Sequence, residues 1–162
     1  MYRVDSGRNV HSVDFEQKRR LDHVIRDKSM IDLLSRLIGP RVADEAFKAH
    51  YFRDFRFEQF VIGAYDAERQ DFFRRHRDNL GGKTAQRRFA ISINLNDDFD
   101  GGGVMFPEFG AHRYRPPAGG ALIFSCLFAH EAVPVTRGRR FVLLTFLVDP
   151  QGRPHPWCVS TD

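Results

Sequence analysis

Three residues of this sequence have the types and the spacing to hold one metal ion. His76 and Asp78 are two positions apart, so on an extended chain their side chains point the same way, with Cα atoms roughly 6.5 Å apart. His130 lies 54 residues beyond His76, shortly after the apolar segment 121–125. Two imidazoles and one carboxylate form the ligand set of non-haem iron(II) sites, which leave coordination positions open for substrates. The pattern therefore predicts an iron(II) centre.

The spacing alone leaves alternatives open. A His-x-Asp pair arises by chance on surface loops, and a further His adds little in a chain with 7 His residues. Zinc accepts the same donors, although zinc sites favour four-coordination.

Arg140 strengthens the hypothesis of a chemical site. It stands at the start of the apolar run 141–148, where a guanidinium entering a buried strand needs a fixed anion, because unpaired burial of a charge is costly. Bidentate binding of a small-molecule carboxylate would satisfy it. The alternative is a surface arginine beside Arg139.

The residues before this centre are predicted to be helical. Ser29 and Asp32 resemble a capping box, and Gly39-Pro40 is expected to end one helix and allow another to begin. Apolar residues at helical spacing predict helices at 15–27, 30–38 and about 41–51.

From residue 53 onward the apolar pattern has the period of strands. Gly- and Pro-rich turn segments separate these runs. The expected strands are 55–65, 72–78, 87–96, 104–106, 121–125 and 139–148. Helices followed by many short strands predict an α+β chain whose β part is a sandwich or barrel.

The strand 87–96 bears on the site because its two faces differ. The odd positions are mostly apolar, whereas the even positions include Ala90, Ser92 and Asn94. Such a polar face belongs either to a surface strand in contact with water or to the lining of a cavity inside a barrel. An apolar lining or ordinary core packing is expected of Phe99, Phe106, Phe124 and Phe146.

Length and composition exclude several classes of protein. The 162 residues suffice for one domain with a sizeable core, and 42% apolar with 28% charged residues argues against disorder. The longest apolar stretch is too short to span a membrane, and the first residues do not resemble a signal peptide. Two Cys residues are too few to indicate a disulfide framework, so the expected location is a reducing cytoplasm. A net charge of +4 supports a nucleic-acid partner only weakly.

The chain resembles the prolyl 4-hydroxylase-like branch of the 2-oxoglutarate- and Fe(II)-dependent dioxygenases over about 90 residues. The order and spacing of nine segments carry the resemblance: 61–65, 72–79, 93–96, 99–102, 106–108, 117–121, 130–131, 134–135 and 138–141.

The resemblance implies a fold, a double-stranded β-helix (jelly roll, cupin-like) with supporting N-terminal helices. Residues 1–52 would form the helical support within the same domain, 53–150 the jelly-roll core and 151–162 a C-terminal tail.

The resemblance also implies the roles of six residues. His76, Asp78 and His130 would hold Fe(2+). Arg140 would bind the distal carboxylate of 2-oxoglutarate, and Tyr65 would lie near the iron and this cosubstrate. Some relatives have a tyrosine on that carboxylate at the position of Asn94, which can still donate a hydrogen bond.

The implied activity is hydroxylation of an unactivated C–H bond with decarboxylation of 2-oxoglutarate to succinate and CO2. Halogenating relatives lack the carboxylate that Asp78 supplies here, so hydroxylation is preferred. The partners would be O2 and a prolyl, other amino-acid or small-molecule substrate, with L-ascorbate as a further cofactor. Two alternatives remain: a catalytically inert jelly-roll binding module, and a nucleic-acid demethylase that uses the same chemistry.

Overall fold

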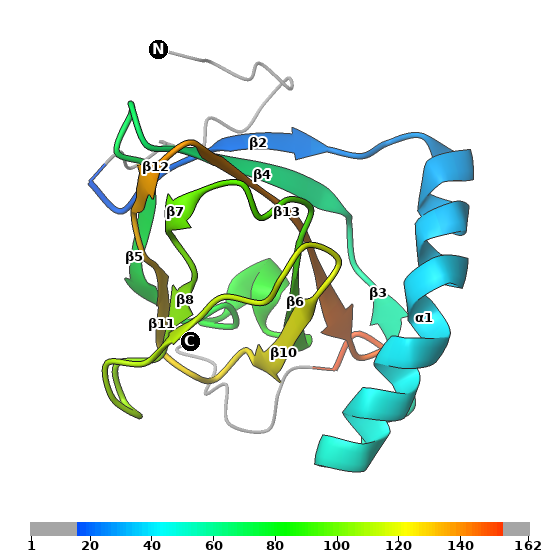
Figure 1. The fold of residues 1–162 in the computed structure, drawn as a ribbon. Helices are drawn as coiled ribbons and strands as arrows, with labels where there is room; N and C mark the ends of the chain where they lie inside the picture. Colours follow the sequence, from blue (N-terminus) through cyan, green and yellow to red (C-terminus); the bar gives the residue numbers. More distant parts are fainter. Residues whose placement is uncertain (1–15, 154–162) are drawn as a thin grey trace.

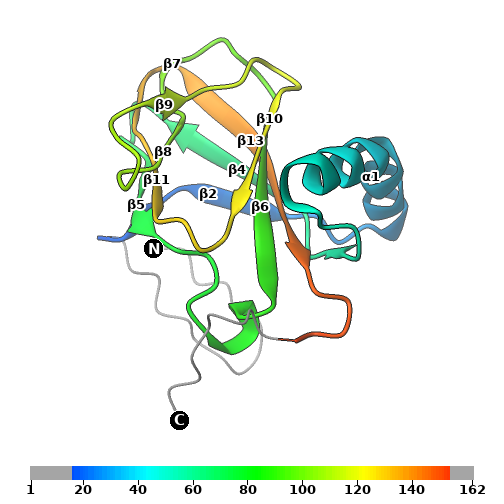
Figure 2. The same cartoon turned by 90° about the horizontal axis from the view of Figure 1, so that it is seen from below.

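Two facing antiparallel sheets and one long helix form the part of the protein that the computed structural model describes, residues 16–153. Residues 154–162 of the expected tail lie outside it. The sheets curve around a common interior, and the helix α1 (Lys28–His50) lies outside them (Figures 1 and 2). In this part of the chain no helix has the length and apolar character needed to cross a membrane.

The larger sheet has six strands, with the longest strand at its centre. In spatial order it contains β10 (Ala121–Ser125), β6 (Arg87–Asn94), β13 (Arg139–Val148), β4 (Val61–Asp66) and β2 (Leu21–Val24), with β3 (Arg56–Phe57) pairing with the end of β13.

The smaller sheet has five strands and faces the first. Its order is β1 (Lys18–Arg19), β5 (Phe72–His76), β11 (His130–Ala132), β8 (Val104–Met105) and β9 (Arg113–Tyr114). The pair β12 (Val135–Arg137) and β7 (Asp100–Gly101) lies at one end, and a short 3-10 turn, η1 (Gly82–Thr84), precedes β6.

The polar face of β6 lines a cavity. Ala90 and Ser92 border the space between the sheets, and both are about 5% exposed. The opposite face carries Ile91, which packs against α1 together with other apolar side chains. Both faces of the strand are therefore buried, which removes the alternative of a surface strand in contact with water.

The predicted helix at 15–27 is wrong, because this segment forms β1 and β2. Lys18, Arg20, Asp22 and Val24 all line the cavity, so every second residue points inward, as in a strand. The spacing of the apolar residues suggested a helix because the inward face of this segment is charged, not apolar.

The expected break at Gly39-Pro40 is also absent. One helix continues from Lys28 to His50 with Pro40 inside it. Proline removes one backbone hydrogen bond, and packing of the following turns on the sheet, where Val42 and Ala46 are buried, compensates. The N-cap is Asp27, whose carboxylate accepts from the Met30 amide at 2.8 Å, in place of the expected Ser29.

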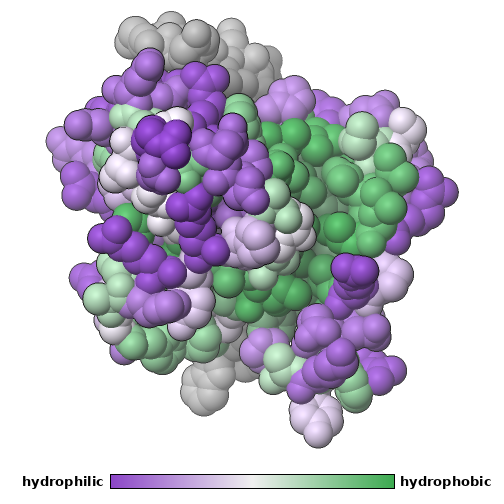
Figure 3. Space-filling view, in the orientation of Figure 1, coloured by the Kyte–Doolittle hydropathy of each residue, from purple (hydrophilic) through white to green (hydrophobic). Residues whose placement is uncertain are grey.

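Apolar side chains gather where α1 adjoins the larger sheet, while polar ones dominate the side of β5 and β11 (Figure 3). Leu147, on the helix-facing side of β13, is fully buried in the cluster with Val42, Ala46 and Ile91.

We expect Leu147→Ala to lower the free energy of unfolding by about 2–5 kcal/mol, because it leaves a cavity between helix and sheet. Urea unfolding measures this. The matched control is Leu37→Ala on α1, where the side chain is 64% exposed and the change should stay within about 0.5 kcal/mol. Equal effects of the two substitutions would show that α1 does not pack on β13 as described.

Candidate metal centre

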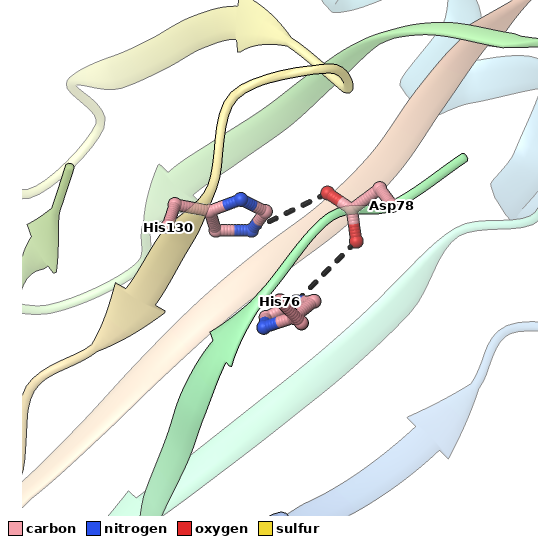
Figure 4. Close-up of side chains that lie close together, drawn as sticks. All are labelled: His76, Asp78 and His130. Carbon is pink, nitrogen blue, oxygen red and sulfur yellow. Dashed lines mark ion pairs between the residues drawn. The ribbon is translucent and has the colours of Figure 1, made fainter. Parts of the chain in front are cut away.

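The three predicted ligands come from two neighbouring strands of the smaller sheet. His76 ends β5, Asp78 follows two residues later, and His130 begins β11. His130 is the cross-strand partner of His76, so pairing of the strands brings residues 54 positions apart into contact. In Figure 4 each of the two imidazoles faces a different oxygen of the carboxylate, and the ring centroids are 4.3 Å apart.

The donor atoms of these residues converge. Nε2 of His76 lies 3.4 Å from Oδ1 of Asp78, and Nε2 of His130 lies 3.3 Å from Oδ2. One ligand atom from each residue can be chosen so that all lie within 4.8 Å of one another. Two ligands at right angles on one ion, each about 2.1 Å from it, are about 3.0 Å apart. The three side chains therefore fit a single ion.

Hydrogen bonds prepare both imidazoles for metal binding. Nδ1 of His76 is 2.7 Å from the Arg74 carbonyl oxygen, and Nδ1 of His130 is 3.0 Å from that of Phe128. A carbonyl only accepts, so Nδ1 carries the proton in each ring and Nε2 keeps its lone pair for a metal. Burial lowers the pKa of His130, which favours the neutral, ligating form.

The carboxylate of Asp78 stays ionised. Burial acts to raise its pKa, but the neighbouring imidazoles of His76 and His130 and the guanidinium of Arg87 outweigh burial, so the pKa lies below its usual value. A metal ligand must be deprotonated, and Asp78 meets this condition.

A cavity of about 310 Å³ extends from these three residues between the two sheets. Tyr65 and Arg140, which are cross-strand partners on β4 and β13, line it together with the three candidate ligands. Phe124 and Phe146 line the cavity and also pack in the core cluster of Phe106, whereas Phe99 belongs to a separate core cluster.

Arg140 is a buried cation without a carboxylate partner among the described residues. It is 2% exposed, and its Nε donates to Oδ1 of Asn94 at 2.9 Å. Burial lowers its pKa, yet an arginine side chain keeps its proton inside proteins. A buried guanidinium in a cavity calls for an anion, and the cavity leaves room for one.

Tyr65 lines this cavity, whereas Asn94 does not. It is fully buried beside Arg140, and its Nδ2 donates to the carbonyl oxygen of Pro116 at 2.6 Å. Both polar atoms of the side chain are thus used within the protein.

The family model of the 2OG-Fe(II) oxygenase superfamily matches residues 61–148, a range that contains His76, Asp78, His130 and Arg140. The chain belongs to the 2OG-Fe(II) oxygenase superfamily. Membership in this superfamily implies Fe(2+) and 2-oxoglutarate, and the donor set described above fits the metal.

Curated oxygenases of this superfamily are similar over most of the chain. A multifunctional procollagen lysine hydroxylase and glycosyltransferase from Rattus norvegicus is 28% identical over 147 residues, which cover 88% of this chain and 18% of that protein. A human procollagen-lysine 2-oxoglutarate dioxygenase is 29% identical over 91% of this chain and 19% of its own. The chain thus spans about a fifth of the length of these relatives.

Solved oxygenase structures share the fold. A prolyl-4-hydroxylase from Pseudomonas putida superposes with a TM-score of 0.63 at 21% identity, covering 82% of this chain and 73% of the other. A prolyl hydroxylase from Trichoplax adhaerens gives 0.69 at 16% identity, with coverage of 91% and 71%. The predicted jelly roll is confirmed.

Charged residues of the cavity wall were missed in the sequence. Lys18, Arg20 and Asp22 line the cavity from the segment that was expected to be helical. Arg19 is charged as well, so charge does not alternate in this segment and gives no strand signal. Phe73 was also missed; its ring stacks on His76 with centroids 3.5 Å apart.

Proposed function

We propose that this chain is an Fe(II)- and 2-oxoglutarate-dependent dioxygenase that hydroxylates an unactivated C–H bond. One observation carries the proposal: a three-residue metal site and a buried arginine without a carboxylate partner among the described residues border the same cavity. When bound, Fe(2+) and 2-oxoglutarate supply the oxidising chemistry, in which O2 is consumed and succinate, CO2 and a hydroxylated product are formed.

His76, Asp78 and His130 act as the metal ligands in this proposal. Their Nδ1–H bonds to backbone carbonyls fix the rings of the two histidines, and the ionised Asp78 supplies the negative charge that holds a divalent cation. Phe73, stacked on His76, and Phe124 keep bulk water away from the reacting groups.

Arg140 binds the distal carboxylate of 2-oxoglutarate. Its Nε is occupied by Asn94, which orients the guanidinium, so the terminal N–H groups serve the bidentate contact with a carboxylate. Asn94 thus positions Arg140. Tyr65, beside Arg140 on the neighbouring strand, donates its hydroxyl proton to the cosubstrate.

The substrate proposed here is a prolyl or other amino-acid side chain, in a peptide or free. The relatives named above are procollagen lysine and prolyl hydroxylases, which supports this class. We further propose L-ascorbate as the reductant that maintains Fe(2+), and a cytoplasmic location, supported by the buried free thiol of Cys126.

Turnover tests the proposal directly. With Fe(2+), 2-oxoglutarate, ascorbate and O2, the protein is expected to form succinate, and a proline- or lysine-containing peptide or free amino acid should gain one oxygen atom by mass spectrometry. Omission of Fe(2+) is the control and should stop both. Folded protein that binds neither metal nor 2-oxoglutarate would instead be an inert jelly-roll binding module.

A further inference from the structure

The segment that contains β1 and β2 crosses from one sheet to the other beside the cavity. β1 pairs with β5 of the smaller sheet, and β2 pairs with β4 of the larger sheet. Arg20 is the residue between the two strands, and it lines the cavity. Arg20 therefore places a positive charge in the cavity wall. It belongs to a part of the chain that precedes the residues 61–148 matched by the family model.

The guanidinium of Arg20 is held at two points. Its Nε and Nη2 donate to the two carboxylate oxygens of Asp22 at 2.5 and 3.1 Å, and its Nη1 donates to the hydroxyl oxygen of Tyr65 at 2.9 Å. The side chain of Arg20 is only 9% exposed. A bidentate contact with a carboxylate fixes both the position and the plane of a guanidinium, so the third bond is directed at the phenol.

A glycine makes room for this arrangement. A Cβ atom at Gly63 on β4 would lie 3.0 Å from both Cδ and Nε of Arg20. The side chain of Arg20 thus crosses the backbone of β4 where that strand has no side chain, and reaches Tyr65 two residues further along.

We infer that Arg20, held by Asp22, is a positioning residue that directs the hydroxyl proton of Tyr65 into the cavity. A phenol can accept and donate, whereas a guanidinium only donates. Because Nη1 of Arg20 occupies the acceptor side of the oxygen, the O–H of Tyr65 is left to donate to an acceptor in the cavity. The inference rests on the proposed function, in which that acceptor is an oxygen of 2-oxoglutarate.

Arg20 and Arg140 have different roles in this arrangement. Arg20 is paired with Asp22, which also pairs with Lys18, whereas no carboxylate of the described chain pairs with Arg140. Both guanidinium carbons lie near the ring of Tyr65, at 5.4 Å for Arg20 and 5.6 Å for Arg140. Arg140 supplies the charge for the dianion, and Arg20 acts on 2-oxoglutarate only through the phenol.

A double-mutant cycle tests whether Arg20 acts on 2-oxoglutarate through the phenol of Tyr65. Affinity for 2-oxoglutarate is measured by calorimetry on Mn(2+)-loaded protein, which does not turn over. Tyr65→Phe should weaken binding about tenfold or more, the value of one hydrogen bond to a charged acceptor. Arg20→Gln should weaken it about tenfold, and the double variant should bind no more weakly than Tyr65→Phe alone. In the active enzyme Arg20→Gln should raise the KM for 2-oxoglutarate with kcat nearly unchanged.

Two further variants keep the result interpretable. Gly63→Ala leaves Arg20 in the chain but displaces its side chain, so it should also weaken 2-oxoglutarate binding. This variant takes the place of Arg20→Gln if Arg20→Gln does not fold. Arg137→Gln removes an exposed arginine that pairs with Asp100 and does not line the cavity, and should bind 2-oxoglutarate like the wild type.

The outcomes separate the two proposals. If the wild type binds 2-oxoglutarate but the effects of Arg20→Gln and Tyr65→Phe simply multiply, Arg20 does not act through the phenol and the inference is overturned while the proposed function stands. If wild-type protein loaded with metal does not bind 2-oxoglutarate, the proposed function fails and the inference fails with it.

Discussion

Replacing Asp78 by alanine is expected to abolish Fe(2+) binding and 2-oxoglutarate turnover. The two oxygens of the carboxylate lie 3.4 and 3.3 Å from the Nε2 atoms of His76 and His130, and Asp78 is the negatively charged member of the triad. Even partners outside the ligand set change metal affinity about 10- to 100-fold, so loss of a ligand should exceed a hundredfold. The readout is the visible absorption band that Fe(2+) and 2-oxoglutarate produce together without oxygen, followed by succinate formation in air.

The control for this experiment is Asp100→Ala. Asp100 is an exposed carboxylate on β7 that pairs with Arg137, and its removal should leave the band and the turnover intact. Circular dichroism should show the same fold for both variants. A full-strength band in Asp78→Ala would mean that the metal is held elsewhere, and the assignment of the triad would be withdrawn.

Replacing Arg140 by methionine is expected to weaken 2-oxoglutarate binding about a hundredfold or more and to leave Fe(2+) binding unchanged. Arg140 is the buried cation to which the described chain offers no carboxylate, and a charged pair formed with a ligand inside a protein contributes several kcal/mol once both groups are desolvated. Calorimetry on Mn(2+)-loaded protein measures the affinity for 2-oxoglutarate. A titration with Fe(2+) alone measures whether metal binding is unchanged.

The same substitution should not destabilise the ligand-free protein. A buried charge without a counter-ion lowers stability, and methionine of similar length fills the space without that penalty, so the melting temperature should be unchanged or higher. Arg139→Gln is the control, since this neighbour pairs with Asp66 and is about half exposed. A lower melting temperature with unchanged 2-oxoglutarate affinity would assign Arg140 a purely structural role.

The sequence predicted the convergence of His76, Asp78 and His130 better than it predicted the elements that precede them. His76, Asp78 and Arg140 stand in or next to strands that the sequence predicts at 72–78 and 139–148, so their place in the chain follows from local pattern. That His130 meets His76 depends on pairing of β11 with β5, which local pattern does not contain; the family resemblance supplied it.

The segment 18–24 could not be assigned in the same way. A strand whose inward residues are Lys18, Arg20 and Asp22 has no apolar stripe, because it lines a polar cavity and not a core. Its Leu21 is 52% exposed, so apolarity also fails to mark the inner face. The place of Asn94 likewise depended on a distant partner, the carbonyl of Pro116, that no spacing rule includes.

The position of β13 has a consequence for how the protein is made. This strand is the last one of the described chain to leave the ribosome, yet it pairs with β6 on one side and β4 on the other. Until residues 139–148 emerge, both neighbours present open edges, which nascent chains expose to chaperones and to aggregation. Folding of the larger sheet therefore waits for residues 139–148, and the strand that completes the sheet also brings Arg140 into the cavity wall.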